Sequence, residues 1–205
     1  MAKDKIPGEE RRKQILENAR ILFARHGYAG ARTRDIAAAC GVNEAVLYKH
    51  FDCKEDLFIE VLNEMHDMVS RAARSRLKPG MSGLEIVREM INSLWFDFAS
   101  KKDYFAIIIH AMTMGMDKEG YRKPMFARWS IHHERLSEAI EKGRRDGSIK
   151  SDVDSDMFAS ILLSLGYAYS VFNTVHISEA LKTPDPIPVF ETVLDCLDSQ
   201  KPAHI

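Results

Sequence analysis

The chain contains few cysteines and no long hydrophobic run. Its three cysteines, Cys40, Cys53 and Cys196, are an odd number among 205 residues, and no two lie close together in sequence. This spacing argues against a disulfide framework and against a zinc cluster, and reduced thiols are the simpler interpretation. No stretch approaches the ~20 apolar residues of a membrane helix. The first eight residues lack the apolar run of a signal peptide. We therefore expect a cytoplasmic protein with no membrane association.

The residue patterns that mark metal proteins and enzymes are also missing from the sequence. No His-Glu-x-x-His spacing occurs, and the adjacent His132 and His133 would point about 100° apart on a helix, so they cannot chelate one ion. No nucleophile motif or phosphate-binding loop is present. Acid–base pairs such as His133 with Glu134 leave an all-α enzyme as an alternative. We expect no catalysis, no metal and no cofactor.

Charge is balanced over the whole chain but not along it. The sequence has 29 basic and 30 acidic residues, for a net charge of −1. Residues 1–54 carry 11 basic and 7 acidic residues, whereas residues 55–205 carry 18 and 23. A basic N-terminal part joined to an acidic remainder fits a DNA-binding module attached to a part that does not contact DNA.

Apolar residues recur at helical spacing through nearly the whole chain, and no stretch alternates with the period of a strand. The pattern predicts an all-α fold, with a small domain at residues 1–54 and a larger helical domain at residues 55–200. The expected helices are 9–26, 33–40, 44–51, 54–77, 83–100, 104–114, 118–146, 154–175 and 189–197. A stiff linker is expected at 183–188, because each proline there removes a donor and fixes φ.

The most informative stretch is a pair of very short helices, Thr33–Cys40 and Glu44–Phe51, with a tight turn at Gly41 between them. Asn43 is a good N-cap for the second helix. Neither helix can bury a core alone, so the pair is expected to fold against the first helix. The second helix then presents outward the side chains of Glu44, Ala45, Val46, Tyr48, Lys49 and His50. A short exposed helix of this size fits the major groove of DNA.

Five groups of residues stand at characteristic distances from one another in this part of the chain: Gly27-Tyr28, Arg34-Asp35-Ile36-Ala37, Cys40-Gly41-Val42, Leu47-Tyr48-x-His50-Phe51 and Lys54-Glu55-x-Leu57. They resemble the N-terminal signature of the tetracycline-repressor (TetR/AcrR) family, from about Arg12 to Val61. The resemblance implies a three-helix helix-turn-helix DNA-binding domain, followed by a larger C-terminal helical ligand-binding and dimerisation domain. Two positions depart from the family pattern. Arg32 stands where threonine is frequent, so we expect the helix cap at Thr33, or a phosphate contact from Arg32. Cys53 stands where Ser, Gly or Asn is usual, so we expect Asp52 to cap the long helix.

The resemblance also implies the DNA contacts. Lys49 is suited to guanine O6 and N7, and Val46 is suited to a thymine methyl. Tyr48, His50 and Lys54 would hold phosphates and set the register. The full set of DNA-binding candidates is Arg32, Thr33, Arg34, Glu44, Ala45, Val46, Tyr48, Lys49, His50 and Lys54.

A middle region rich in aromatic residues and methionine is expected to form core and also to line a pocket for a small, apolar effector, where the family resemblance places an inducer cavity. The pocket candidates are Trp95, Phe98, Phe105, His110, Met112, Met116, Met125, Trp129 and His133. The last two helices carry more apolar surface than one domain edge should expose, and the resemblance implies a homodimer through them. The interface candidates are Phe158, Ile161, Leu162, Leu165, Tyr169, Phe190, Val193, Leu194 and Leu197.

These expectations describe a repressor whose two heads enter successive major grooves of a near-palindrome, released when an effector tilts the long helix 54–77. Three alternatives remain beside it. The short helix pair could be an αα-hairpin without a DNA role, the protein could bind DNA architecturally without an effector, and it could be an all-α enzyme. Cys53 is interpreted as a passive thiol, with a redox switch as the alternative.

Overall fold

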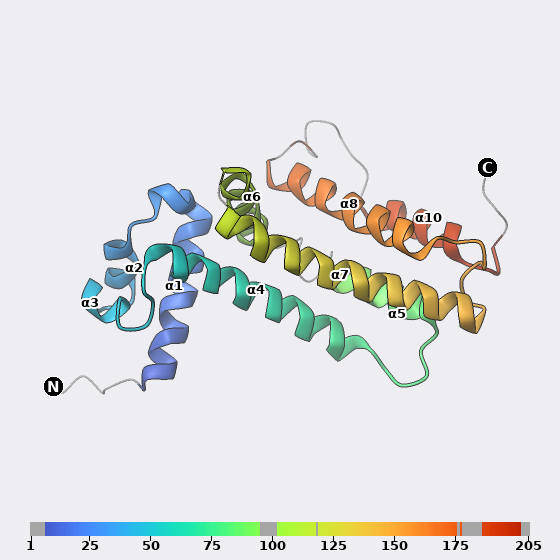
Figure 1. The fold of residues 1–205 in the computed structure, drawn as a ribbon, viewed down its shortest axis with the longest axis horizontal. Coiled ribbons are helices and arrows are strands. Elements are labelled where there is room, and N and C mark those ends of the chain that lie inside the picture. Colours follow the sequence, from blue (N-terminus) through green and yellow to red (C-terminus); the bar gives the residue numbers. More distant parts are fainter. Residues whose placement is uncertain (1–6, 95–101, 118, 176, 178–185, 202–205) are drawn as a thin grey trace. The chain divides into compact units, whose positions relative to one another are not determined.

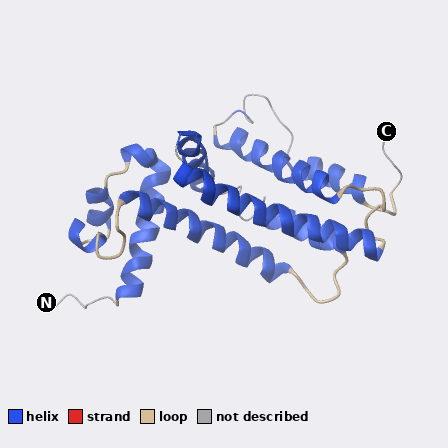
Figure 2. Ribbon diagram, in the orientation of Figure 1, coloured by secondary structure: helices blue, strands red, loops and turns tan. Residues whose placement is uncertain are grey.

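The computed structural model describes residues 7–94, 102–117, 119–175, 177 and 186–201. The regular elements of these residues are helices (Figure 2), which confirms the predicted all-α fold. As labelled in Figure 1, they are α1 Gly8–Gly30, α2 Thr33–Ala39, α3 Glu44–Leu47, α4 Lys54–Arg76, α5 Gly83–Asn92, α6 Lys102–Asp117, α7 Glu119–Asp146, α8 Ser155–Thr174 and α10 Pro186–Leu197. The chain forms two compact units, one of Met1–Asp67 with Ala106–Pro124 and one of Met68–Phe105 with Met125–Ile205.

In the first unit, α2 packs against both α1 and α3. We expected Ile36, Ala37, Val42, Leu47 and Phe51 to face inward; four of them are buried and Val42 is half-buried, because two helices this short can shield their apolar sides only against their neighbours. The turn between them depends on Gly41, whose φ of 67° is the left-handed conformation that favours glycine.

Part of α6 and the start of α7 belong to this same unit. Tyr121 of α7 is 1% exposed, and its ring lies 6.1 Å from the rings of both Tyr28 and Phe58. His110 of α6 packs against Gly27, where α1 kinks with φ 67° and ψ 174°. These contacts have no local signal in the sequence, since they join residues about 60 to 95 positions apart.

The second unit contains α5, α8 and α10 with the remaining parts of α4, α6 and α7. Helix α10 packs against α5 and α8, and apolar side chains from α5, α7, α8 and α10 fill the core. The buried set includes Val87, Ile91, Leu136, Ile140, Leu162, Leu163, Phe190, Leu194 and Leu197. Helices α5 and α7 approach so closely that a Cβ added to Gly83 would lie only 2.0 Å from the backbone nitrogen of Gly143.

Three predicted helix bounds were wrong for physical reasons. The helix predicted for residues 44–51 ends at Leu47, because the next residues close a turn in which His50 N–H donates to Leu47 O at 3.0 Å. Helix α10 begins at Pro186, inside the predicted linker, since a first turn tolerates residues without an N–H. The helix predicted for 83–100 is regular only to Asn92, and residues 95–101 lie outside the described part.

Candidate DNA-binding site and effector region

The candidate DNA-binding surface is the outward side of α3 and the turn after it. Asn43 caps α3 as expected, its side chain accepting from Val46 N–H at 3.1 Å. The outward residues are 44–46 and 48–50, and the buried Leu47 separates the two groups. Ala45, Tyr48 and Lys49 are exposed, whereas Glu44, Val46 and His50 are half-buried. The side chains expected to contact DNA therefore do reach the surface.

Thr33 joins the two short helices through its hydroxyl group. It donates a hydrogen bond to the Glu44 carboxylate, and it accepts one from Tyr48 Oη at 3.3 Å. The cap expected at Thr33 was wrong: Arg32 occupies the N-cap position of α2, and neither residue caps the helix with its side chain. The Thr33 hydroxyl is used instead to hold α3 against α2.

The candidate DNA-binding lysine and arginine side chains differ in their solvent exposure and in their contacts within the protein. Arg32 and Lys49 are exposed, and Arg34 is also exposed with its Nε 3.5 Å from Asp35. Lys54 is different, because its Nζ lies 4.6 Å from the centroid of the Tyr28 ring. Desolvation lowers the pKa of Lys54, so this ammonium is partly withdrawn from solvent.

The start of α4 departs from expectation. Cys53, and not Asp52, caps the helix: the N–H of Asp56 donates to Cys53 Sγ at 3.4 Å. The backbone N–H of Asp52 donates in turn to Asp56 Oδ2 at 3.1 Å. The exposed Cys53 thiol thus has a structural role at the start of α4.

Arg12 of α1 contacts Phe51 and Glu60, and the sequence did not predict either contact. Its guanidinium carbon lies 5.1 Å from the centroid of the Phe51 ring, and it also forms an ion pair with Glu60 of α4. Arg12 therefore joins α1 to the end of the α3 turn and to α4. A pairing across 48 positions has no local signal in the sequence.

The structure distributes the effector candidates over both units. His110, Met112 and Met116 lie in the first unit, with Met116 80% exposed. The candidates in the second unit are Phe105, Met125, Trp129 and His133, and Trp95 and Phe98 lie outside the described residues.

Tyr167, which was not among the candidates, brings two of them together. Its ring centroid lies 6.3 Å from that of Phe105 and 4.7 Å from that of Trp129. Burial raises the pKa of the Tyr167 hydroxyl. His133 has another environment, with its Nε2 3.1 Å from Asp156 O and 3.0 Å from Ser160 Oγ, which joins α7 to α8.

The candidate interface residues on α8 and α10 fall into two groups. Leu162, Phe190, Leu194 and Leu197 are buried within the single chain, and Phe158, Leu165, Tyr169 and Val193 are half-buried. Ile161 is 41% exposed. It lies on a stripe of large exposed apolar side chains that follows α8 and includes the residue directly after it: Met157, Ile161, Phe172 and Val175. We call these four residues the α8 stripe.

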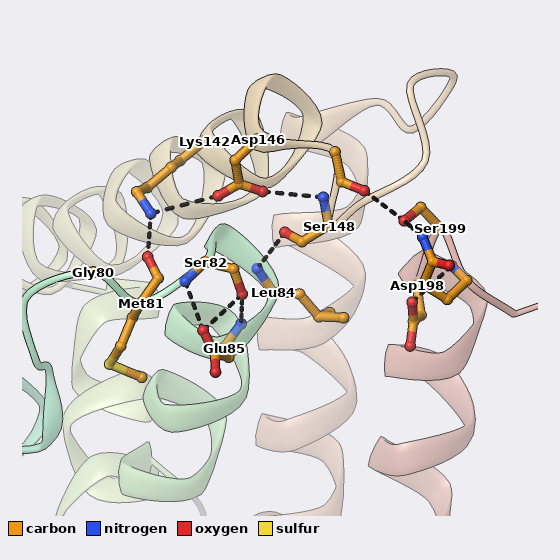
Figure 3. Close-up of a pocket in the computed structure, with 12 residues that line it drawn as sticks. Gly80, Met81, Ser82, Leu84, Glu85, Lys142, Asp146, Ser148, Asp198 and Ser199 are labelled. Carbon is orange, nitrogen blue, oxygen red and sulfur yellow. Dashed lines mark hydrogen bonds and ion pairs between the residues drawn. The ribbon is translucent and has the colours of Figure 1, made fainter.

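A hollow of about 570 Å³ lies at the end of the second unit, where α5 begins and α7 ends (Figure 3). Polar groups that line this hollow form hydrogen bonds with one another. The N–H of Gly83 donates to Asp146 Oδ2 at 2.8 Å, the N–H of Leu84 donates to Ser148 Oγ at 3.1 Å, and Lys142 donates to Met81 O. Side chains thus take up the N-terminal amides of α5, and the hollow is a junction that fixes helix ends.

Within the described residues, no helix combines the length and apolar character needed to cross a membrane. The same residues contain no group of three or more His, Cys, Asp or Glu side chains that could hold a metal ion.

Comparison with known proteins agrees with this architecture. Residues 15–61 match the family model described as bacterial regulatory proteins, tetR family. The HTH-type transcriptional repressor AcnR of Corynebacterium diphtheriae is 30% identical over 157 residues, which are 74% of this chain and 75% of that protein. The HTH-type transcriptional regulator UidR of Escherichia coli K12 is 26% identical over 161 residues, which are 76% and 78% of the two chains.

Solved structures show the same fold. AibR, in complex with isovaleryl coenzyme A and operator DNA, has a TM-score of 0.69 at 23% identity, covering 93% of this chain and 99% of that one. FadR of Bacillus subtilis, in complex with stearoyl-CoA, has a TM-score of 0.72 at 19% identity, covering 91% and 97%. Because a helix-turn-helix surface, a family model and a relative matched over three quarters of its length agree, the chain belongs to the tetR family and is a DNA-binding transcriptional regulator.

Proposed function

We propose that the protein is a homodimeric repressor that binds a near-palindromic operator and is released by a small, mostly apolar effector. The observation that carries the proposal is the outward side of α3 and of the turn after it, where small side chains stand on a helix short enough for the major groove and the exposed Lys49 follows them. Arg32 and Arg34 flank this surface and suit phosphates. Because its partner is operator DNA, the protein is proposed to act in the cytoplasm. Its proposed role is regulation and not catalysis.

The symmetric dimer is proposed to form through the α8 stripe together with α10. Three large apolar side chains on α8 and Val175 directly after it cost free energy while they face water, and a second copy of the same face would cover them. The half-buried Leu165, Tyr169 and Val193 are proposed to lie at the margin of this contact.

The effector is proposed to bind near Phe105, Trp129 and Tyr167, whose rings provide an apolar and polarisable surface. Helix α4 runs without a break from Lys54 to Arg76 and contributes residues to both units. An effector that favours one orientation of α4 would change the spacing of the two heads on DNA. A coupling of ~1.4 kcal/mol suffices for a tenfold change in affinity.

Selection from a random DNA library by the purified protein, followed by sequencing, tests the proposal. A near-palindromic motif, with half-sites about one helical turn apart, is the expected result. Weak, salt-sensitive binding without an enriched motif would contradict the proposal and favour an architectural DNA-binding protein. The selected operator then serves to screen apolar compounds for release of the protein.

A further inference from the structure

Three side chains on the DNA-facing surface form a directed chain of hydrogen bonds. Tyr48 Oη donates to Thr33 Oγ1 at 3.3 Å, and Thr33 Oγ1 donates to Glu44 Oε1. Each hydroxyl has one proton. The proton of Tyr48 is therefore directed at Thr33, and the proton of Thr33 is directed at the carboxylate, where the chain ends.

This direction limits what Tyr48 and Thr33 can do on DNA. A phosphate oxygen needs a donor, and in the free protein both hydroxyls are directed at acceptors within the protein. Phosphate contact by Thr33 would leave the Glu44 carboxylate without its donor, and phosphate contact by Tyr48 would remove the hydrogen bond that orients the Thr33 hydroxyl. Their geometry suits them instead to orient Glu44, since Thr33 lies at the start of α2 and Tyr48 directly follows α3.

Glu44 keeps one carboxylate oxygen available. Within the described part of the chain, no group donates a hydrogen bond to its Oε2. Glu44 is half-buried and is the first residue of α3, beside the exposed Ala45. A carboxylate accepts hydrogen bonds and repels phosphates, so close to DNA it is favourable only where a base presents an amino group.

The major groove offers two such amino groups. Adenine presents N6–H₂ beside the acceptor N7, whereas cytosine presents N4–H₂ with no acceptor on the same base edge. A single carboxylate oxygen would meet repulsion from adenine N7 but none of this kind from cytosine. We propose that Glu44 is a specificity-determining residue that accepts a hydrogen bond from a cytosine in each half-site, and that Thr33 and Tyr48 are its positioning residues. This inference rests on the proposed function.

The test compares DNA motifs selected by the wild-type protein and by Glu44→Gln. Wild type is expected to select cytosine at one position of each half-site. Glu44→Gln is expected to lose about tenfold of the preference for cytosine at that position, with adenine gaining, because glutamine pairs with adenine N6 and N7. The other positions should keep their preferences. The matched control is Glu17→Gln, which removes the same charge from an exposed residue of α1 paired with Arg20 and should select the wild-type motif.

The outcomes separate this inference from the proposed function. Identical motifs for wild type and Glu44→Gln would overturn the role of Glu44 and leave the repressor proposal intact. A wild-type motif without a Glu44-dependent cytosine would do the same. Failure of the wild-type protein to enrich any motif would overturn both.

The positioning role has its own readout. Thr33→Val and Tyr48→Phe remove the hydroxyls but keep the bulk, and both are expected to weaken the preference at the cytosine position alone by several-fold. Thr33→Ser keeps the hydroxyl and should restore it. A uniform loss of affinity for all sequences, or a cytosine preference unchanged in Thr33→Val, would overturn the positioning role. Thermal unfolding of each variant separates these effects from loss of fold.

Discussion

At Gly27 the backbone adopts a conformation that a side chain resists, and a neighbour stands where the side chain would be. Its φ of 67° and ψ of 174° belong to a region occupied essentially by glycine. A Cβ added there would lie 2.9 Å from His110 Cε1. Gly27→Ala is expected to lower the free energy of unfolding by about 2–3 kcal/mol, measured by urea unfolding.

A double-mutant cycle with His110→Ala divides that loss into backbone strain and collision with the imidazole ring. If the ring contributes, Gly27→Ala will cost less in the His110→Ala background than in wild type. Equal costs in both backgrounds would show that the backbone conformation alone is responsible.

Asp146 is a residue whose ionisation stabilises the fold. Hydrogen bonds from Ser148, from the N–H groups of Gly83 and Ser148, and from Lys142 lower its pKa to about 2. Because the folded pKa lies below the ordinary value, the stabilisation is present above about pH 4 and is lost as pH falls towards 2. Asp146→Asn should therefore be less stable than wild type at pH 7, and the difference should shrink between pH 4 and pH 2. Urea unfolding at a series of pH values measures this. A difference independent of pH would assign the effect to packing.

Single residues differed in how well the sequence predicted their roles. The cap by Asn43 was predictable because the capping bond is local, joining residues three positions apart. Capping by Cys53 in place of Asp52 was not, since the choice depends on which side chain the turn directs at the N–H of Asp56. The ion pair of Arg12 with Glu60 depends on how α1 and α4 pack, and no spacing in the sequence encodes that.

At the scale of elements, helical periodicity located the helices well, and their ends were wrong where turns and prolines decide. The same reasoning could not assign parts of α6 and α7 to the first unit. Periodicity shows that one side of a helix is buried but not which helix covers it. Tyr121 illustrates the point, because its aromatic character predicted burial but not contact with Tyr28 and Phe58.

That assignment predicts the behaviour of the isolated N-terminal helices. A fragment of residues 1–67 lacks Tyr121, and so exposes the sides of Tyr28 and Phe58 that the Tyr121 ring covers. It also lacks His110, which packs against Gly27. A chain this short buries little surface and is marginally stable even with a complete core. The fragment is expected to show reduced helicity by circular dichroism and no cooperative thermal transition. Cooperative unfolding close to that of the full chain would instead support an independent domain.

At the scale of the whole molecule, the proposed dimer depends on the α8 stripe. A single helix-turn-helix makes too few contacts for tight specific binding, and a symmetric dimer gains affinity because its second head binds at high effective concentration. The buried Leu162 and Leu194 already complete the core of one chain. The free energy of association must therefore come from side chains that the single chain leaves in solvent.

Ile161→Glu places a charge in the middle of the α8 stripe, where a second copy would have to desolvate it. The variant is expected to sediment as a monomer at micromolar concentration and to bind the operator about a hundredfold more weakly than wild type. Phe126→Glu is the matched control: Phe126 is 71% exposed on α7, outside the stripe, so its variant should remain dimeric and keep its affinity. A dimeric Ile161→Glu would move the interface away from the stripe. A monomer with wild-type affinity would show that one head suffices, contrary to the requirement for a palindrome.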